Sequence, residues 1–259
     1  MSYVESERNG AVLRITINRP DKKNALTGEM YSALASALEE SESDARVRVL
    51  LLHGNGESFT AGNDLEDFLN KPWKGQAMPP AVRFIRAVAA AKKPVVAAVQ
   101  GLAVGVGTTI LLHCDLVYAA TDARFMMPFI NLGIVPEAAS TVLLPIFIGH
   151  QRAAEMFMLG APLIAQRAYE MGLVNAVVSP EALLPTATAA AQQLAGRPAT
   201  ALLACKRLMK RAFQAEVERA LDEEVQIISE RLESPETKEA LSAFLEKRKP
   251  DFSRFQPSN

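Results

Sequence analysis

The sequence predicts an α/β protein with a largely parallel sheet, followed by a set of helices. Short apolar runs recur along the first two thirds of the chain and alternate with segments of helical periodicity. This alternation is typical of folds built from strand–helix–strand units. Several runs are apolar at consecutive positions, which indicates strands that helices cover on both faces. Beyond about residue 180 only helical patterns occur.

Five apolar runs predict the strands, and each stops near residues that are typical of turns. These runs are 11–17, 47–53, 94–100, 116–120 and 173–178. Helical spacing of apolar residues occurs between them, and Thr27 is a candidate N-cap for the first helix. The predicted helices are 27–38, 82–89, 108–114, 153–157, 182–195, 199–213, 216–232 and 235–247.

Two segments have more than one interpretation. The helix at 216–232 carries an apolar stripe, which either packs on another subunit or covers the core of its own chain. The stripe consists of Leu221, Val225, Ile228 and Leu232. The segment 70–80 is rich in proline, so we expect no regular structure there. Its Trp73 is either a lid residue or a packing anchor.

Composition excludes several classes of protein. Lys and Arg number 28 against 29 Asp and Glu, so no basic excess is available to bind nucleic acid or an anionic membrane. No apolar run approaches the roughly 18 residues that a membrane-spanning helix needs. The two cysteines, Cys114 and Cys205, cannot form a disulfide framework. We expect a cytoplasmic protein.

Cofactor motifs are incomplete. The turn Gly105-Val106-Gly107 is similar to the start of a dinucleotide-binding motif, but Ile110 stands where the third glycine belongs. The three histidines, His53, His113 and His150, lie apart in apolar or turn contexts. We interpret them as packing residues. The sequence therefore predicts no metal site and no nicotinamide cofactor.

Two glycine-containing turns, 59–65 and 101–107, each follow a predicted strand. Glycine allows backbone N–H groups to turn toward a ligand, and a helix N-terminus adds partial positive charge. Two converging N–H groups are what an oxyanion hole requires. Each turn taken alone is read first as a tight turn with a purely structural role.

Six segments in order resemble the crotonase (enoyl-CoA hydratase/isomerase) superfamily. They are INRPDKKNAL at 17–26, AGNDL at 61–65, PVVAAVQG at 94–101, CDLVYA at 114–119, the stretch from APL to AYEMGLVN at 161–175, and FLEKR at 244–248. The resemblance implies an α/β spiral of ββα units over residues 1–195 that holds an acyl-CoA site. It also implies a C-terminal helical region, 196–259, that builds a homotrimer or a dimer of trimers. CoA would be part of the substrate, with no other cofactor.

The resemblance also assigns roles to individual residues. The backbone N–H groups of Asn63 and Val106 would form the oxyanion hole. Residues that would line the acyl-CoA site are Lys23, Ala25, Ala61, Asp64, Leu65, Gly105 and Phe129.

One departure from the family pattern bears on the activity. Hydratases of this family carry two glutamates, and here their positions correspond to Thr109 and Phe129. A carboxylate, Glu137, follows Phe129 by eight residues, in a pattern that is similar to the single-glutamate Δ3,Δ2-enoyl-CoA isomerases. There this glutamate is the only base. Its apolar neighbours should raise its pKa toward the operating pH.

Other interpretations stay open at this point. Glu137 is also compatible with a helix-start carboxylate that complements the helix dipole. The chain is compatible with a hydratase or another crotonase activity that uses a different acid. It is also compatible with a non-catalytic acyl-CoA-binding protein that kept the fold.

Overall fold

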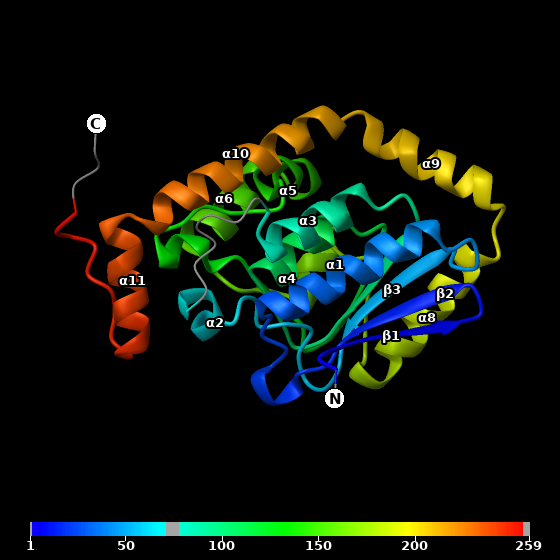
Figure 1. Ribbon diagram of the computed structural model, residues 1–259, viewed down its shortest axis with the longest axis horizontal. Coiled ribbons are helices and arrows are strands. Elements are labelled where there is room, and N and C mark those ends of the chain that lie inside the picture. Colours follow the sequence, from blue (N-terminus) through cyan, green and yellow to red (C-terminus); the bar gives the residue numbers. More distant parts are fainter. Residues whose placement is uncertain (1, 71–77, 256–259) are drawn as a thin grey trace.

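The main sheet contains the five predicted strands and one more. The computed structural model describes residues 2–70 and 78–255 (Figure 1). The strands lie in the order β1-β2-β3-β4-β6-β9. β1 is antiparallel to β2, and all other neighbouring pairs are parallel. Their bounds are Val4–Asn9 (β1), Val12–Ile17 (β2), Val49–Gly54 (β3), Val95–Val99 (β4), Leu116–Ala120 (β6) and Ala176–Val178 (β9).

Two of these strands differ from the sequence prediction. β1 was not predicted, because it is an edge strand whose residues after Val4 are all exposed and mostly polar. β9 is shorter than the apolar run 173–178. Leu173 and Val174 are buried, but they precede the strand in a turn.

A second, smaller sheet was also missed by the sequence analysis. Its strands, in the order β5-β7-β8, are Leu102–Val104 (β5), Arg124–Met126 (β7) and Leu163–Ile164 (β8). They are too short to produce a recognisable apolar run. After β4 and again after β6, the chain enters this sheet and then a helix. After β3 the chain also reaches this sheet, where Thr60 forms a single β-bridge with Ala103 of β5, and then enters α2. This repeated path confirms the predicted spiral of ββα units.

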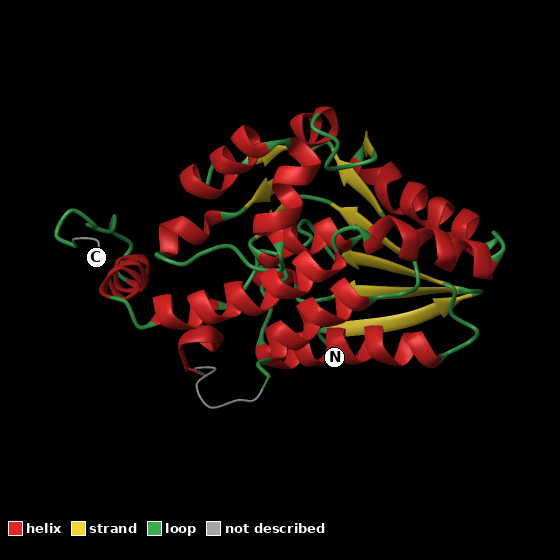
Figure 2. Ribbon diagram, turned by 90° about the horizontal axis from the view of Figure 1, so that it is seen from above, coloured by secondary structure: helices red, strands yellow, loops and turns green. Residues whose placement is uncertain are grey.

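Helices cover both faces of the main sheet (Figure 2). On one face α8 packs against alternate strand residues such as Leu51 and Val96. On the other face α1, α3 and the α4–η2 segment enclose the larger core. The Thr27 side chain accepts a hydrogen bond from the Met30 N–H, so the predicted cap of α1 is confirmed. Helical elements up to this point are η1 (Pro20–Lys22), α1 (Gly28–Ser43), α2 (Leu65–Asn70), α3 (Pro80–Ala90), α4 (Val106–Thr109), η2 (Ile110–His113), η3 (Pro128–Leu132), α5 (Ser140–Ile148), α6 (His150–Leu159), α7 (Ala165–Glu170) and α8 (Pro180–Ala195).

The last three helices extend across and beyond the core (Figure 1). They are α9 (Ala199–Arg211), α10 (Gln214–Leu232) and α11 (Pro235–Leu245). Helix α10 packs on α5, and α11 packs on η3. Leu221 and Ile228 of the apolar stripe are buried within their own chain. These two residues cover the core of their own chain, whereas Val225 and Leu232 of the stripe are only half-buried.

Other apolar side chains remain exposed in the single chain. The largest ones on α6, α9 and α11 are Met158, Leu159, Leu208, Met209, Phe213, Phe244 and Leu245, with Phe213 at the junction of α9 and α10. Most of the segment 70–80, with Trp73, lies outside the described residues; Asn70 ends α2 and Pro80 begins α3. Within the described part of the chain, no helix combines the length and the apolar character needed to cross a membrane.

Candidate active site

The two glycine-containing turns after β3 and β4 are in direct contact. The Thr60 N–H donates to the Leu102 carbonyl (2.9 Å), and the Val104 N–H donates to the Thr60 carbonyl (3.0 Å). Gly62 has a φ of +85°, and a Cβ at this position would lie 2.8 Å from the Val104 carbonyl oxygen. Only glycine allows this approach without strain. The turn at 59–65 therefore needs a glycine at position 62, where the turn at 101–107 passes against it.

The two predicted oxyanion donors both follow this contact between the turns. Thr60 pairs with Ala103 and Gly62 lies against Val104, and Asn63 and Val106 come one and two residues later. The Gly105 N–H donates to the Met126 carbonyl. Val106 is the first residue of α4, and the N–H groups in the first turn of a helix have no acceptor within the helix. Among the described residues, neither the Asn63 N–H nor the Val106 N–H has an acceptor. Two adjacent free amides can bind one developing negative charge.

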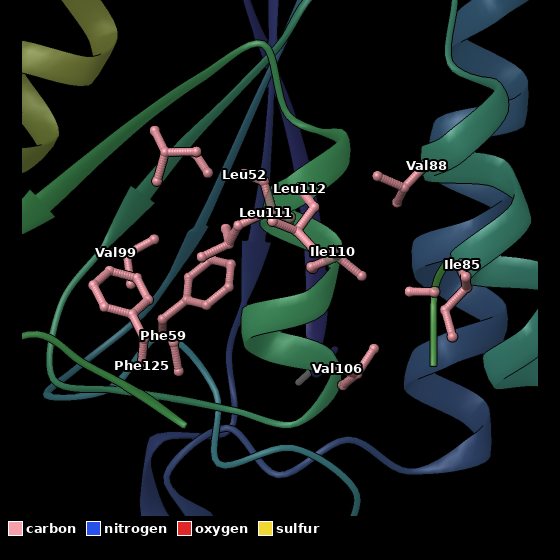
Figure 3. Close-up of a cluster of buried hydrophobic side chains, with 14 of the residues drawn as sticks. Leu52, Phe59, Ile85, Val88, Val99, Val106, Ile110, Leu111, Leu112 and Phe125 are labelled. Carbon is pink, nitrogen blue, oxygen red and sulfur yellow. The ribbon is translucent and has the colours of Figure 1, made fainter. Parts of the chain in front are cut away.

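Apolar packing fixes the helix that carries Val106. Figure 3 shows Val106 at the start of the α4–η2 segment, with Phe59 and Phe125 on one side and Ile85 and Val88 of α3 on the other. All five side chains are buried. The start of this helix therefore cannot shift without disturbing the core, and the direction of its free N–H groups is set before a ligand binds.

Glu137 lies on the segment between η3 and α5 and is enclosed by protein. Only 8% of the residue is exposed, and its Oε1 atom has no hydrogen-bond partner among the described residues. Burial, and to a smaller extent the charge of Glu224, raise the pKa of Glu137 to about 8. A carboxyl group with such a pKa can exchange a proton near neutral pH.

Tyr31 of α1 binds Asn63 directly and interacts with Glu137 through its charge. Its hydroxyl donates to the side-chain Oδ1 of Asn63. Burial raises the pKa of Tyr31, and the nearby charge of Glu137 contributes in the same direction. The sequence analysis did not single out Tyr31, because an aromatic residue beside the apolar stripe of α1 reads as a core residue.

The backbone after Glu137 is held by two side chains from distant elements. The Nε2–H of His113 donates to the Ala138 carbonyl (2.7 Å), and burial lowers the pKa of this histidine to about 4. His113 is thus a neutral packing residue, as predicted. Glu224 of α10 accepts the Ala139 N–H (2.6 Å). The sequence analysis missed Glu224, since it resembles the other glutamates that flank the α10 stripe.

The comparison with known proteins identifies the family. The enoyl-CoA hydratase/isomerase family profile matches residues 7–255, which is nearly the whole chain. The chain belongs to the crotonase superfamily.

Relatives in this superfamily cover the chain almost end to end. The 1,2-epoxyphenylacetyl-CoA isomerase of Escherichia coli is 37% identical, over 98% of this chain and 99% of its own. The 2,3-dehydroadipyl-CoA hydratase of the same bacterium is 33% identical, over 97% and 99%. The crystal structure of an enoyl-CoA hydratase/isomerase from Pseudoalteromonas atlantica superposes with a TM-score of 0.93 and 43% identity, over 97% of this chain and 100% of that one.

In this crotonase, the two positions where a hydratase would carry glutamates are closed by neutral side chains. Thr109 is fully buried, and its hydroxyl donates to the Val106 carbonyl (3.4 Å). The Phe129 ring lies 3.8 Å from where a Cβ on Gly105 would stand. Phe129 therefore packs beside Gly105, the residue before Val106.

The structure also brings together the residues predicted to line the CoA site. The Ala61 N–H donates to the Lys23 carbonyl (2.9 Å). Arg19 donates to the Ala25 carbonyl (3.0 Å) and forms an ion pair with Asp64 (2.6 Å). Asp64 also accepts the Asp67 N–H (3.0 Å) and so caps α2, which begins at Leu65. The Asp64 carboxylate is thus engaged by internal partners on both Arg19 and α2.

No group of three or more His, Cys, Asp or Glu residues within 2–70 and 78–255 is placed to hold a metal ion. Cys114 and Cys205 are free thiols.

Proposed function

We propose that this crotonase is a Δ3,Δ2-enoyl-CoA isomerase, which moves the double bond of a 3-enoyl-CoA to the 2-trans position in fatty-acid or related acyl-CoA catabolism. The observation that supports this most is the pairing of one buried carboxylate, Glu137, with neutral residues at Thr109 and Phe129. Hydration needs one group to activate water and another to manage the α-proton, whereas isomerisation needs a single base.

The backbone amides would stabilise the charge that develops during the reaction. Removing a proton from C2 moves negative charge onto the thioester oxygen. The N–H groups of Asn63 and Val106 would hold that oxygen, each contributing about 3 kcal/mol if they act like other oxyanion-hole donors. Because the amides are fixed by the backbone, they would need little reorganisation as the charge appears.

Glu137 would carry the proton from C2 to C4. As a carboxylate it removes the C2 proton, and as a carboxylic acid it returns a proton to C4 of the dienolate. The raised pKa of about 8 suits both directions, because near neutral pH the carboxyl group is mostly protonated while a working fraction is ionised and can accept the C2 proton. Burial of the carboxyl group limits exchange of its proton with water.

Hydration and non-catalytic acyl-CoA binding are the two alternative functions, and the same residues argue against both. Relatives named as hydratases make hydration the second candidate, but it requires an acid that Thr109 and Phe129 cannot supply. A non-catalytic acyl-CoA-binding protein has no use for an unpaired carboxyl group in an apolar environment, since burying it costs stability.

We further propose that the chain acts in the cytoplasm without a cofactor other than the CoA of its substrate, as a homotrimer or a dimer of trimers. The exposed apolar residues of α6, α9 and α11 support assembly, because such side chains are commonly covered in oligomers.

Substitution of the base tests the proposal. With a 3-enoyl-CoA as substrate, appearance of the conjugated thioester is followed by ultraviolet absorbance. Glu137→Gln keeps the size of the side chain but removes the base, so turnover should fall by about 10²–10⁴-fold with little change in acyl-CoA affinity. Thr109→Ala is the matched control and should have a mild effect. Near-full activity of Glu137→Gln would overturn the proposal.

A further inference from the structure

The backbone that follows Glu137 has an unusual conformation. Ala138 and Ala139 have φ values of +63° and +53°. This left-handed region is unfavourable for residues with a Cβ, and here two consecutive alanines occupy it. Such a conformation persists only where the surrounding structure holds it. The direction of the Glu137 side chain depends on it, because the strained residues follow Glu137 directly.

Glu224 makes the contacts that hold this backbone. One carboxylate oxygen accepts the Ala139 N–H at 2.6 Å. The other accepts the Thr141 N–H at 3.1 Å and the Thr141 hydroxyl at 2.6 Å. Glu224 reaches the loop from α10 and is only 4% exposed. Both oxygens are thus occupied by the segment that joins Glu137 to α5, and His113 fixes the Ala138 carbonyl of the same segment.

The charge of Glu224 is not neutralised by an ion pair. In the part of the chain that the structure describes, no Lys, Arg or His side chain forms a salt bridge with it. Burial raises the pKa of Glu224, and the three hydrogen bonds that its carboxylate accepts offset part of this rise. Burying a second carboxyl group near Glu137 costs stability. If the only role of Glu224 were to hold this backbone, a neutral hydrogen-bond acceptor would do so at a lower cost in stability.

We propose that Glu224 is the positioning residue of the catalytic base. It holds the left-handed backbone at Ala138 and Ala139, which directs the Glu137 carboxyl group into the site, and its negative charge keeps a proton on Glu137 available for return to the substrate. This role rests on the proposed function, in which Glu137 shuttles the proton.

The pH dependence of Glu137 also involves its other neighbours. The ionisable groups that face Glu137 or its loop are Tyr31 of α1, His113 of η2 and Glu224 of α10. Arg231 of α10 lies near the start of the same loop, where it donates to the Gly133 carbonyl, and its charge is paired with Glu236. His113 is neutral above about pH 4 and Tyr31 is neutral across the working range. The group whose charge acts on Glu137 is therefore Glu224.

The test compares Glu224→Gln with Glu223→Gln, which changes an exposed glutamate one position earlier on the same helix. In Glu224→Gln the amide cannot accept all three hydrogen bonds, so kcat should fall by about 10–100-fold with KM almost unchanged, as for other displaced catalytic groups. The acidic limb of the pH profile of kcat/KM should move to lower pH, because a charge that raises the pKa of Glu137 is gone. Glu223→Gln should leave kcat, KM and the profile as in the wild type.

Two results would overturn the inference. One is a Glu224→Gln enzyme with wild-type kcat and an unshifted acidic limb. The other is a loss of activity that the fraction of unfolded protein accounts for entirely. If Glu224→Gln does not fold, Thr141→Val removes one of the donors to Glu224 and should lower kcat several-fold at constant KM. An unchanged kcat in Thr141→Val would then overturn the inference.

Failure of the proposed function gives a different result. If Glu137→Gln keeps its activity, Glu137 is not the base, whatever the Glu224 variants show.

Discussion

Replacing the buried Glu137 by glutamine should stabilise the protein, and the gain should grow with pH. The folded chain holds this carboxyl group with a pKa of about 8, against 4.5 for a solvated glutamate. Below pH 4.5 both states bind the proton, so stability is fully present. As the pH rises toward 8, the unfolded chain gains from ionisation while the folded chain does not, and stability is lost.

The size of this effect follows from the two pKa values. Each unit of difference corresponds to about 1.4 kcal/mol, so the folded chain loses up to about 3 kcal/mol at pH 7 and up to about 5 kcal/mol above pH 8. Glu137→Gln removes the ionisation and keeps the size of the side chain. The variant should therefore match the wild type near pH 4.5 and exceed its free energy of unfolding by those amounts at higher pH.

Urea unfolding at pH 5, 7 and 8.5, at one fixed chain concentration, measures this difference. Glu155→Gln, which changes an exposed glutamate on α6, serves as the control and should show little dependence on pH. A difference that is constant with pH, or a Glu137→Gln protein that is less stable than the wild type at pH 8.5, would refute the assignment of a buried neutral carboxyl group.

Two further predictions concern the oxyanion turn and the assembly. Gly62→Ala should lower turnover at least 10-fold, because the new Cβ would lie 2.8 Å from the Val104 carbonyl oxygen. Gly172→Ala is its control, since Gly172 has a similar φ of +81° but nothing within 4 Å of the added Cβ, and equal losses in both variants would count against the contact. Light scattering should give three or six times the chain mass of 28.1 kDa. A monomer over a wide concentration range would disprove the oligomer while leaving the catalytic proposal intact.

The sequence predicts the main sheet well because its strands have a strong local signal. Runs such as Val95–Val99 are buried on both faces, so every residue is apolar. The second sheet has no such signal, because strands of two or three residues gain their stability from pairing with distant segments. The apolar stripe of α10 is visible in the sequence, but the surface that it covers is set by the tertiary fold.

Some residues of the candidate site could likewise be predicted from the sequence, and others could not. A glycine-containing turn after a strand and a carboxylate among apolar neighbours are local features, so the turn at 59–65 and Glu137 could be selected from the sequence. Tyr31 and Glu224 could not, because their importance depends on contacts across 32 and 85 positions of the chain, with Asn63 and Ala139. Nothing in the residues beside them marks these contacts.

We infer that one buried base makes this crotonase an isomerase. The most direct test gives the wild-type enzyme a 3-enoyl-CoA and, separately, the corresponding 2-trans-enoyl-CoA. The conjugated thioester should appear from the first substrate much faster than hydration consumes the second, because Thr109 and Phe129 supply no acid for the addition of water. Faster hydration of the 2-enoyl-CoA than isomerisation of the 3-enoyl-CoA would contradict the claim.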